Sequence, residues 1–160
     1  MYQETVKRKL GKMIEELKVG DKARFSKKIT DRDVHLYMGV TGDMNPIYID
    51  RQYASRTHFE EPIVPGVILA GLIVALISNE LPGKGSITVS QCVEYLAPVR
   101  WNDLVSTEVE IISIDQVKNR VVMNAVSKNQ RGEIVVKGET TVMPPIRLRS
   151  AMSFAFEDYN

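Results

Sequence analysis

The stretch from Gly66 to Ile77 constrains the fold more than any other part of the chain, because each of its residues is apolar or glycine. It is too long for a typical strand and much shorter than the roughly 20 residues needed to cross a bilayer. We therefore expect a buried helix. A helix that is apolar on every side must be enclosed by other parts of the protein.

Segments that can enclose this helix are found in the rest of the sequence. Four segments rich in Val, Ile and Thr are separated by short turns: residues 86–96, 104–114, 120–129 and 133–143. Residues 22–29 form a further, shorter candidate strand. Such segments are typical of strands, and consecutive strands joined by short turns form an antiparallel sheet. The expected architecture is α+β, with a curled antiparallel sheet wrapped around a long central apolar helix.

The N-terminal part of the chain is predicted to be mainly helical. In the first 20 residues, apolar side chains recur at helical spacing at Val6, Leu10, Met13, Ile14 and Leu17. We expect residues 1–20 to form one amphipathic helix outside the main domain. Thr30 and Asp33 match a capping box at the start of a second helix, and Asp50 can cap a further short helix.

Length, charge and cysteine content restrict the possible functions. The 160 residues suffice for one ordinary domain, assigned to residues 21–143, with a C-terminal extension over residues 144–160. The formal net charge of +1 indicates neither a nucleic acid nor a membrane as partner, so a small molecule or protein is expected. The single cysteine cannot form an internal disulfide, and the charged N-terminus does not match a secretory signal. We therefore expect a cytoplasmic protein.

The polar segment from Thr41 to Asp50 is the best candidate for a functional loop. It combines a glycine, an Asn-Pro step and two carboxylates within ten residues, which is typical of an irregular turn. We expect this turn to present Asp43 and Tyr48 on the same face. Gly66 can face them from the start of the apolar helix, where a free backbone N–H lies at the positive end of the helix dipole.

Several separated blocks of the sequence resemble the MaoC-like, (R)-specific enoyl-CoA hydratases, a family with the hot-dog fold. The matching blocks are Gly42-Asp43-x-Asn45-Pro46-Ile47, Ala54, Phe59, Pro62-Ile63-Val64, Gly66, Leu81-Pro82-Gly83-x-Gly85-Ser86-Ile87, Pro98-Val99 and Asp103. The resemblance covers about residues 20–143 and implies a curled antiparallel sheet around one long helix. It also implies an acyl-CoA thioester as substrate, no further cofactor, no metal, and a homodimer or higher homo-oligomer.

The sequence departs from the family pattern at two positions. In the pattern Gly-Asp-x-Asn-Pro-x-His, the Asp and the His hold the reacting water; Asp43 matches the Asp, but Tyr48 occupies the position of the His. The family also usually has a His before the glycine that opens the central helix, where this chain has Pro65. Only about one tyrosine in a thousand is ionised at neutral pH. Tyr48 is therefore a poor base and a good hydrogen-bond donor.

The resemblance and the chemistry of hydration together assign roles to the candidate residues. We expect Asp43 to act as the base or proton shuttle, and the Tyr48 hydroxyl to position water or to donate to the substrate. The Gly66 N–H is expected to donate to the thioester oxygen as negative charge develops there. The expected substrate-binding residues are Asn45, Pro65, Val67 and Lys84, with Arg56 and Arg100 as further candidates for contacts to CoA phosphates. His58 could replace the missing imidazole, although a loop histidine is more often a solvated surface group.

Other functions on the same fold are alternatives. A hot-dog thioesterase would need a carboxylate near the central helix, but residues 66–79 contain no Asp or Glu. The acyl-carrier-protein dehydratases share the Pro-Gly entry to this helix, yet their pattern requires a Glu on it. The main alternative is a non-catalytic acyl-CoA-binding or regulatory protein. Such a protein would keep Gly66 and the apolar pocket but lose the catalytic pair.

Overall fold

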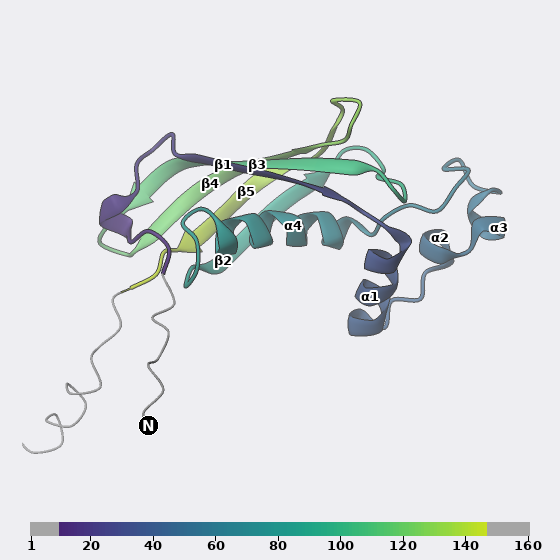
Figure 1. Cartoon of the computed structure of the whole chain (residues 1–160), viewed down its shortest axis with the longest axis horizontal. Coiled ribbons are helices and arrows are strands. Elements are labelled where there is room, and N and C mark those ends of the chain that lie inside the picture. The colour runs from purple at the N-terminus through teal and green to yellow at the C-terminus, as the bar shows by residue number, and fades with distance from the viewer. Residues whose placement is uncertain (1–9, 147–160) are drawn as a thin grey trace, which may run out of the picture.

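The computed structural model describes residues 10–146, which form a curved sheet, one long helix beneath it and a lobe of short helices (Figure 1). The strands are β1 (Lys22–Lys28), β2 (Ile87–Tyr95), β3 (Leu104–Asp115), β4 (Arg120–Lys128) and β5 (Ile134–Met143). Their order in the sheet is β1-β3-β4-β5-β2, and every neighbouring pair is antiparallel. The predicted strands are therefore confirmed, with ends that agree within about one residue.

The inner face of the sheet forms the core because apolar residues alternate along the strands. In β3, for example, Val109 and Ile111 have no exposed surface. The register shifts between Ile111 and Ser113 in β3, and between Thr88 and Ser90 in β2. Bulges of this kind increase the local twist. They help the sheet to curl over the helix below it.

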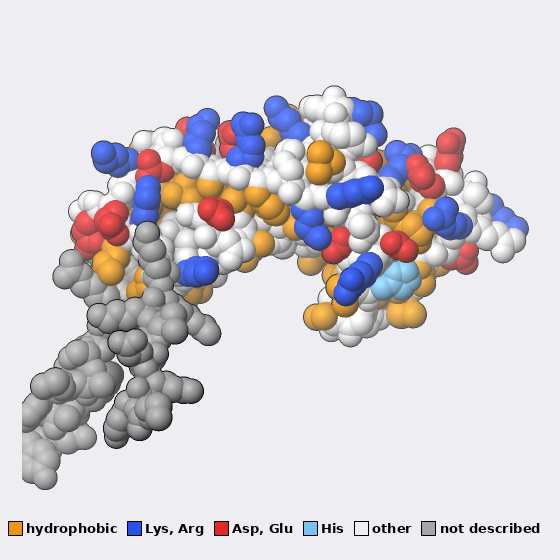
Figure 2. All heavy atoms as spheres, in the orientation of Figure 1, with side chains coloured by type: hydrophobic (Ala, Val, Ile, Leu, Met, Phe, Trp, Pro, Cys, Tyr) orange, Lys and Arg blue, Asp and Glu red, His pale blue; other side chains and the backbone are white. Residues whose placement is uncertain are grey.

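The outer face of the sheet is polar and carries ion pairs between strands. Lys22 and Arg24 on β1 lie 3.5 Å and 2.6 Å from the Glu108 carboxylate on β3. The two cationic side chains are 51% and 71% exposed, so these pairs add little stability. Figure 2 shows charged side chains along this outer face and a band of hydrophobic side chains below it. The two faces of the sheet therefore differ as the alternating pattern predicts.

The central helix α4 (Gly66–Asn79) packs against β1, β2 and β3 (Figure 1). Its buried side is formed by Leu69, Leu72, Ile73, Leu76 and Ile77. The predicted long apolar helix is confirmed. Residues 10–146 leave the other side of it partly uncovered, because Val67 is 57% exposed and Gly71 is also exposed.

A lobe of three short helices extends beyond one end of the sheet (Figure 1). These helices are α1 (Asp31–Thr41), α2 (Pro46–Ile49) and α3 (Arg51–Ala54). Thr30 and Asp33 form the predicted capping box of α1, and Asp50 caps α3 as predicted. Helix α1 ends at Gly42, whose φ of 73° is a left-handed conformation that glycine adopts without strain.

The predicted helix over residues 1–20 is wrong for residues 10–20, which contain only the 3-10 turn η1 (Ile14–Glu16). Backbone N–H groups at the start of this segment donate instead to carbonyl oxygens of the loop after α4. Gly11 lies so close to that loop that a Cβ would clash with the Pro82 carbonyl. These hydrogen bonds to the loop take the place of helical hydrogen bonds. The helical spacing of the apolar residues in the sequence does not indicate this pairing.

Two predicted segments lie partly outside the described residues. They are residues 1–9 of the N-terminal segment and residues 147–160 of the C-terminal extension. Within residues 10–146, no helix is both long enough and apolar enough to cross a membrane.

The variant Ile73→Ala is expected to lower the free energy of unfolding by about 2–5 kcal/mol, because it leaves a cavity between α4 and the sheet. Ile73 has no exposed surface. Denaturant unfolding at one fixed protein concentration measures the loss. The matched control is Val40→Ala, at a residue that is 87% exposed, and it should change the free energy by less than about 0.5 kcal/mol. Equal losses in the two variants would contradict the position of α4 in the core.

Candidate active site

A cavity of about 450 Å³ lies at the N-terminal end of α4. Its lining is mainly apolar and includes Phe59, Val67, Tyr95 and Leu96 together with the predicted site residues Tyr48 and Gly66. An apolar cavity of this size with a few polar groups is typical of a small-molecule site. Tyr95 and Leu96 are 49% and 48% exposed, so this wall of the cavity is open in a single chain.

Gly66 places the start of α4 beside the cavity. Its N-cap residue, Pro65, provides no side-chain cap. Among the described residues, the Gly66 N–H has no hydrogen-bond acceptor, whereas the Ile68 N–H donates to the Pro65 carbonyl at 3.0 Å. A Cβ on residue 66 would lie 2.9 Å from the Tyr95 ring, so any larger residue would force this ring to move. A free N–H at the positive end of a helix can donate to a developing oxyanion.

Backbone hydrogen bonds bring Tyr48 to the same cavity. The Ile47 carbonyl accepts a hydrogen bond from the N–H of Ile63 at 3.2 Å. The next residue, Val64, donates its N–H to the Val99 carbonyl at 2.7 Å. These contacts hold α2 and the loop after β2 against the segment that leads into α4. Groups from three separate parts of the sequence therefore meet at the start of the central helix.

The environment of Tyr48 keeps its phenol protonated. Burial raises the pKa of Tyr48, and the negative charge of Asp43 raises it further. The hydroxyl is therefore a hydrogen-bond donor at neutral pH and is poorly suited to take up a proton. This environment fits the donor role that the sequence suggests.

Asp43 is close enough to Tyr48 for its charge to raise the pKa of the phenol, but it is not among the residues that line the cavity. Both oxygens of its carboxylate accept hydrogen bonds. Oδ2 accepts from the Tyr37 hydroxyl at 2.9 Å, and Oδ1 accepts from the N–H of Asn45 at 3.2 Å. Within one chain, the structure thus brings Tyr48 and Gly66 to one cavity and leaves Asp43 outside its lining.

Tyr37 was not identified as a site residue from the sequence. It precedes Asp43 by six residues on α1, and the turn at Gly42 lies between them. The hydrogen bond to Asp43 raises the pKa of the Tyr37 phenol, which therefore keeps its proton. The sequence pattern that could have indicated the contact between Tyr37 and Asp43 is a glycine cap followed by an acidic residue. Such a cap turns the chain back at the end of the helix.

The predicted substrate-binding residues occupy different positions. Asn45 caps α2 by accepting the N–H of Ile47 at 3.3 Å, and Pro65 precedes the first turn of α4. Val67 lines the cavity. Lys84 lines a separate surface pocket beyond the C-terminal end of α4. The helix has 14 residues and is about 21 Å long. Within one chain, Lys84 is therefore not a neighbour of the cavity.

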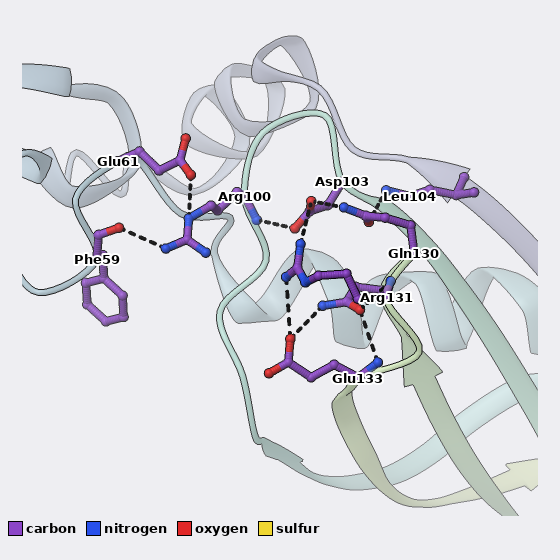
Figure 3. Close-up of polar contacts among 9 residues, drawn as sticks. Phe59, Glu61, Arg100, Asp103, Leu104, Gln130, Arg131 and Glu133 are labelled. Atoms are coloured by element: carbon purple, nitrogen blue, oxygen red, sulfur yellow. Dashed lines mark hydrogen bonds and ion pairs between the residues drawn. The ribbon is translucent and has the colours of Figure 1, made fainter.

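Arg100 holds the loop that forms one wall of the cavity (Figure 3). Its Nε lies 2.6 Å from the Glu61 carboxylate, and its Nη2 donates to the Phe59 carbonyl at 3.0 Å. Glu60, between these two residues, has a φ of 65°, which is uncommon for a residue other than glycine. Arg100 therefore contacts the chain on both sides of a strained residue. Its guanidinium, a candidate for binding CoA phosphates, is already paired with Glu61 and the Phe59 carbonyl.

Asp103 connects the loop between β2 and β3, which carries Arg100, to the turn between β4 and β5 (Figure 3). Its carboxylate accepts hydrogen bonds from the backbone N–H of Arg100 at 2.9 Å and from Nε2 of Gln130 at 2.6 Å. The residue is only 6% exposed. A buried carboxylate that receives such bonds fixes the loop relative to the sheet.

Neither histidine occupies the position of the missing imidazole. His58 is exposed, stacks on Phe59 with ring centroids 3.8 Å apart, and is not part of the cavity lining. His35 contacts the Asp31 carbonyl through Nδ1 at 2.7 Å on the exposed side of α1. Arg56 is also exposed and lies outside the lining. No cluster of His, Cys, Asp and Glu within residues 10–146 could hold a metal ion.

The variant Arg100→Met is expected to lower the free energy of unfolding by about 1–2 kcal/mol, because Glu61 and the Phe59 carbonyl lose their partner. Lys137→Met is the matched control, since it removes an ion pair to Glu94 in which both side chains are more than half exposed. The control should cost less than about 0.5 kcal/mol. Denaturant unfolding compares the two, and a similar small loss in both would show that Arg100 does not hold the loop.

Comparison with known proteins agrees with this geometry. The sequence model for the MaoC like domain matches residues 15–132. The chain is similar to an (R)-specific enoyl-CoA hydratase from Rhodospirillum rubrum, with 35% identity over 133 residues that cover 83% of this chain and 92% of the relative. It is also similar to an (R)-specific enoyl-CoA hydratase from Aeromonas caviae, with 37% identity over 129 residues that cover 81% and 96%.

A solved structure shows the same architecture. The unliganded R-hydratase PhaJ1 from Pseudomonas aeruginosa has a TM-score of 0.80 and 36% identity, and the match covers 88% of this chain and 93% of that chain. The resemblance found in the sequence and the expected hot-dog fold are both confirmed. This chain belongs to the MaoC-like dehydratase family.

Proposed function

We propose that this protein is an enoyl-CoA hydratase, which adds water to a trans-2-enoyl-CoA and catalyses the reverse dehydration of a 3-hydroxyacyl-CoA. One observation carries the proposal. Tyr48 and Gly66, at the N-terminal end of α4, border a single apolar cavity, and Asp43 is close enough for its charge to raise the pKa of Tyr48. The hydratase names of the relatives support the same class of reaction.

The hydration reaction requires a base for water, a proton for Cα and a donor for the thioester oxygen. In our proposal, Asp43 takes a proton from water as the water oxygen bonds to Cβ. The electron pair of the double bond moves toward the thioester carbonyl, and the Gly66 N–H donates to the negative charge that develops on its oxygen. Asp43 then returns the proton to Cα. The carboxylate is regenerated, and one water molecule has been added.

The Tyr48 phenol holds the reacting water by donating a hydrogen bond to it. Because burial and the charge of Asp43 raise the pKa of Tyr48, the phenol stays neutral and leaves the uptake of the proton to Asp43. General acid–base groups typically contribute about 10² to 10⁴ in rate. We therefore expect a slower enzyme than one with histidine at position 48, but an active one.

The substrate is a CoA thioester, and the reaction needs no other cofactor. The apolar lining at Val67 and Phe59 provides room for the acyl chain. Asn45 and Pro65 support the site through the backbone turns that they shape. A contact between Lys84 and the CoA phosphates requires a second copy of the chain, because Lys84 lies at the far end of α4. A cytoplasmic location stays a prediction.

The functional unit is a homodimer. Within residues 10–146, β2 is an edge strand whose one neighbour is β5, and Val89 on this strand is 50% exposed. Helix α4 also contacts β2, and its uncovered side carries Val67. A free strand edge can pair with a strand of another chain, and a large exposed apolar face marks an interaction site. A second copy placed edge to edge would extend the sheet and close the cavity wall at Tyr95 and Leu96.

One observation favours a second candidate function, a non-catalytic acyl-CoA binder or regulator. Asp43 does not line the cavity, and both of its oxygens already accept hydrogen bonds. A binder would need only the apolar cavity and the Gly66 N–H. Catalytic turnover separates the two functions.

The purified protein is expected to hydrate crotonyl-CoA, measured as the loss of the enoyl-thioester absorbance. Asp43→Asn should lower kcat by at least about 10², because it removes the base. Asp31→Asn changes an exposed carboxylate at the start of α1 and should leave kcat unchanged. Tyr48→His should raise kcat, because an imidazole can share the proton transfer.

Three results would count against this account of catalysis. Equal inactivity of the wild type and Asp43→Asn, with CoA esters still bound, would favour the binder. Equal activity of these two proteins would remove Asp43 from the mechanism. Unchanged or lower activity of a folded Tyr48→His variant would contradict the role of position 48.

Analytical ultracentrifugation at micromolar concentration is expected to show a particle of twice the mass of one chain. Val89→Glu should shift it toward the monomer, because a charge at an apolar interface is costly to bury. Val117→Glu is the matched control at a residue that is 98% exposed between β3 and β4, and it should stay dimeric. A monomeric wild type would contradict the proposed dimer, and a dimeric Val89→Glu would place the interface elsewhere.

A further inference from the structure

The contacts around Asp43 include one side chain that the proposed reaction does not use. Tyr37 donates its hydroxyl to Asp43 Oδ2 at 2.9 Å, and the N–H of Asn45 donates to Oδ1 at 3.2 Å. The Asp43 N–H donates to Thr41 Oγ1 at 3.2 Å, and the Thr41 hydroxyl donates to the Tyr37 carbonyl at 2.8 Å. Asp43 is therefore held at its backbone and at both carboxylate oxygens.

We propose that Tyr37 is a positioning residue that orients the Asp43 carboxylate for proton transfer. This inference rests on the proposed hydratase function. An ionised carboxylate has about four acceptor positions, so the bonds from Tyr37 and Asn45 leave positions free to take a proton from water. With a donor on each oxygen, the carboxylate is less free to rotate when substrate enters. Tyr37 itself does not line the cavity and acts through Asp43.

The two phenols near Asp43 differ in what they face. Tyr48 lines the cavity, whereas Tyr37 lies outside the cavity lining and donates its hydroxyl to the Asp43 carboxylate. The hydrogen bond to Asp43 raises the pKa of Tyr37, so this phenol remains a donor and does not compete for the proton of the water. Because no imidazole stands at position 48, the orientation of the carboxylate depends on these neighbours.

A structural role of Tyr37 makes a different prediction. In that case its hydroxyl would only close the end of α1 after Gly42, and its removal would lower activity in proportion to the folded fraction. A positioning role requires a loss of turnover in protein that remains fully folded. It also requires that this loss depends on the carboxylate at position 43.

The test measures steady-state hydration of crotonyl-CoA by the full chain and its variants. Tyr37→Phe removes only the hydroxyl and should lower kcat by roughly 10- to 100-fold, with KM within about two-fold. Tyr53→Phe is the control, because this phenol is 48% exposed and makes no side-chain hydrogen bond within residues 10–146. The double variant Tyr37→Phe, Asp43→Asn should be no slower than Asp43→Asn alone, because Tyr37 acts through Asp43.

An active wild type with an unaffected Tyr37→Phe variant would overturn the positioning role and leave the hydratase function intact. A further loss in the double variant would overturn it as well. A wild type that does not hydrate crotonyl-CoA would reject both proposals. If Tyr37→Phe does not fold, Thr41→Val removes the link between the Tyr37 carbonyl and the Asp43 N–H, and it should lower kcat at unchanged KM. An unchanged kcat in that variant would likewise overturn the positioning role.

Discussion

Burial of α4 is the constraint on which the rest of the structure depends. Between Gly66 and Ile77 the helix has no polar side chain, so most of its surface must be removed from water. The curled sheet covers the side that carries Ile73 and Leu76. Burial of each such side chain contributes about 1.5–3 kcal/mol, so this packing determines where the helix lies. The opposite side remains open at Val67, and a second copy of the chain would complete the burial.

The burial of α4 also determines where its N-terminal N–H group at Gly66 lies. Gly66, the first residue of the helix, lines a cavity, and its N–H has no acceptor among the described residues. Two backbone hydrogen bonds, from Ile63 to Ile47 and from Val64 to Val99, add α2 and the loop after β2 to this place. A phenol and a helix N-terminus thus meet in an apolar setting, where hydrogen bonds to a developing charge are stronger than in water.

Much of the fold could be predicted from the sequence because its signals are local. The apolar run of α4, the alternation in the strands, and the caps at Thr30 and Asp50 all depend on neighbouring residues. The polar turn followed by an apolar run also indicated that Tyr48 and Gly66 would lie together. Contacts such as those of Tyr37 and Arg100 could not be predicted, because they depend on how loops and helix ends meet in space. The predicted N-terminal helix was wrong for the same reason, since the backbone of this segment pairs with a loop some 70 residues away.

A structure of the Asp43→Asn variant with bound crotonyl-CoA tests the central claim most directly. The account predicts that the thioester oxygen lies about 2.7–3.1 Å from the backbone nitrogen of Gly66. It also predicts that the enoyl Cβ faces Tyr48 and the side chain at position 43. A thioester bound outside the cavity at the start of α4, or a Gly66 N–H that points away from its oxygen, would contradict the account.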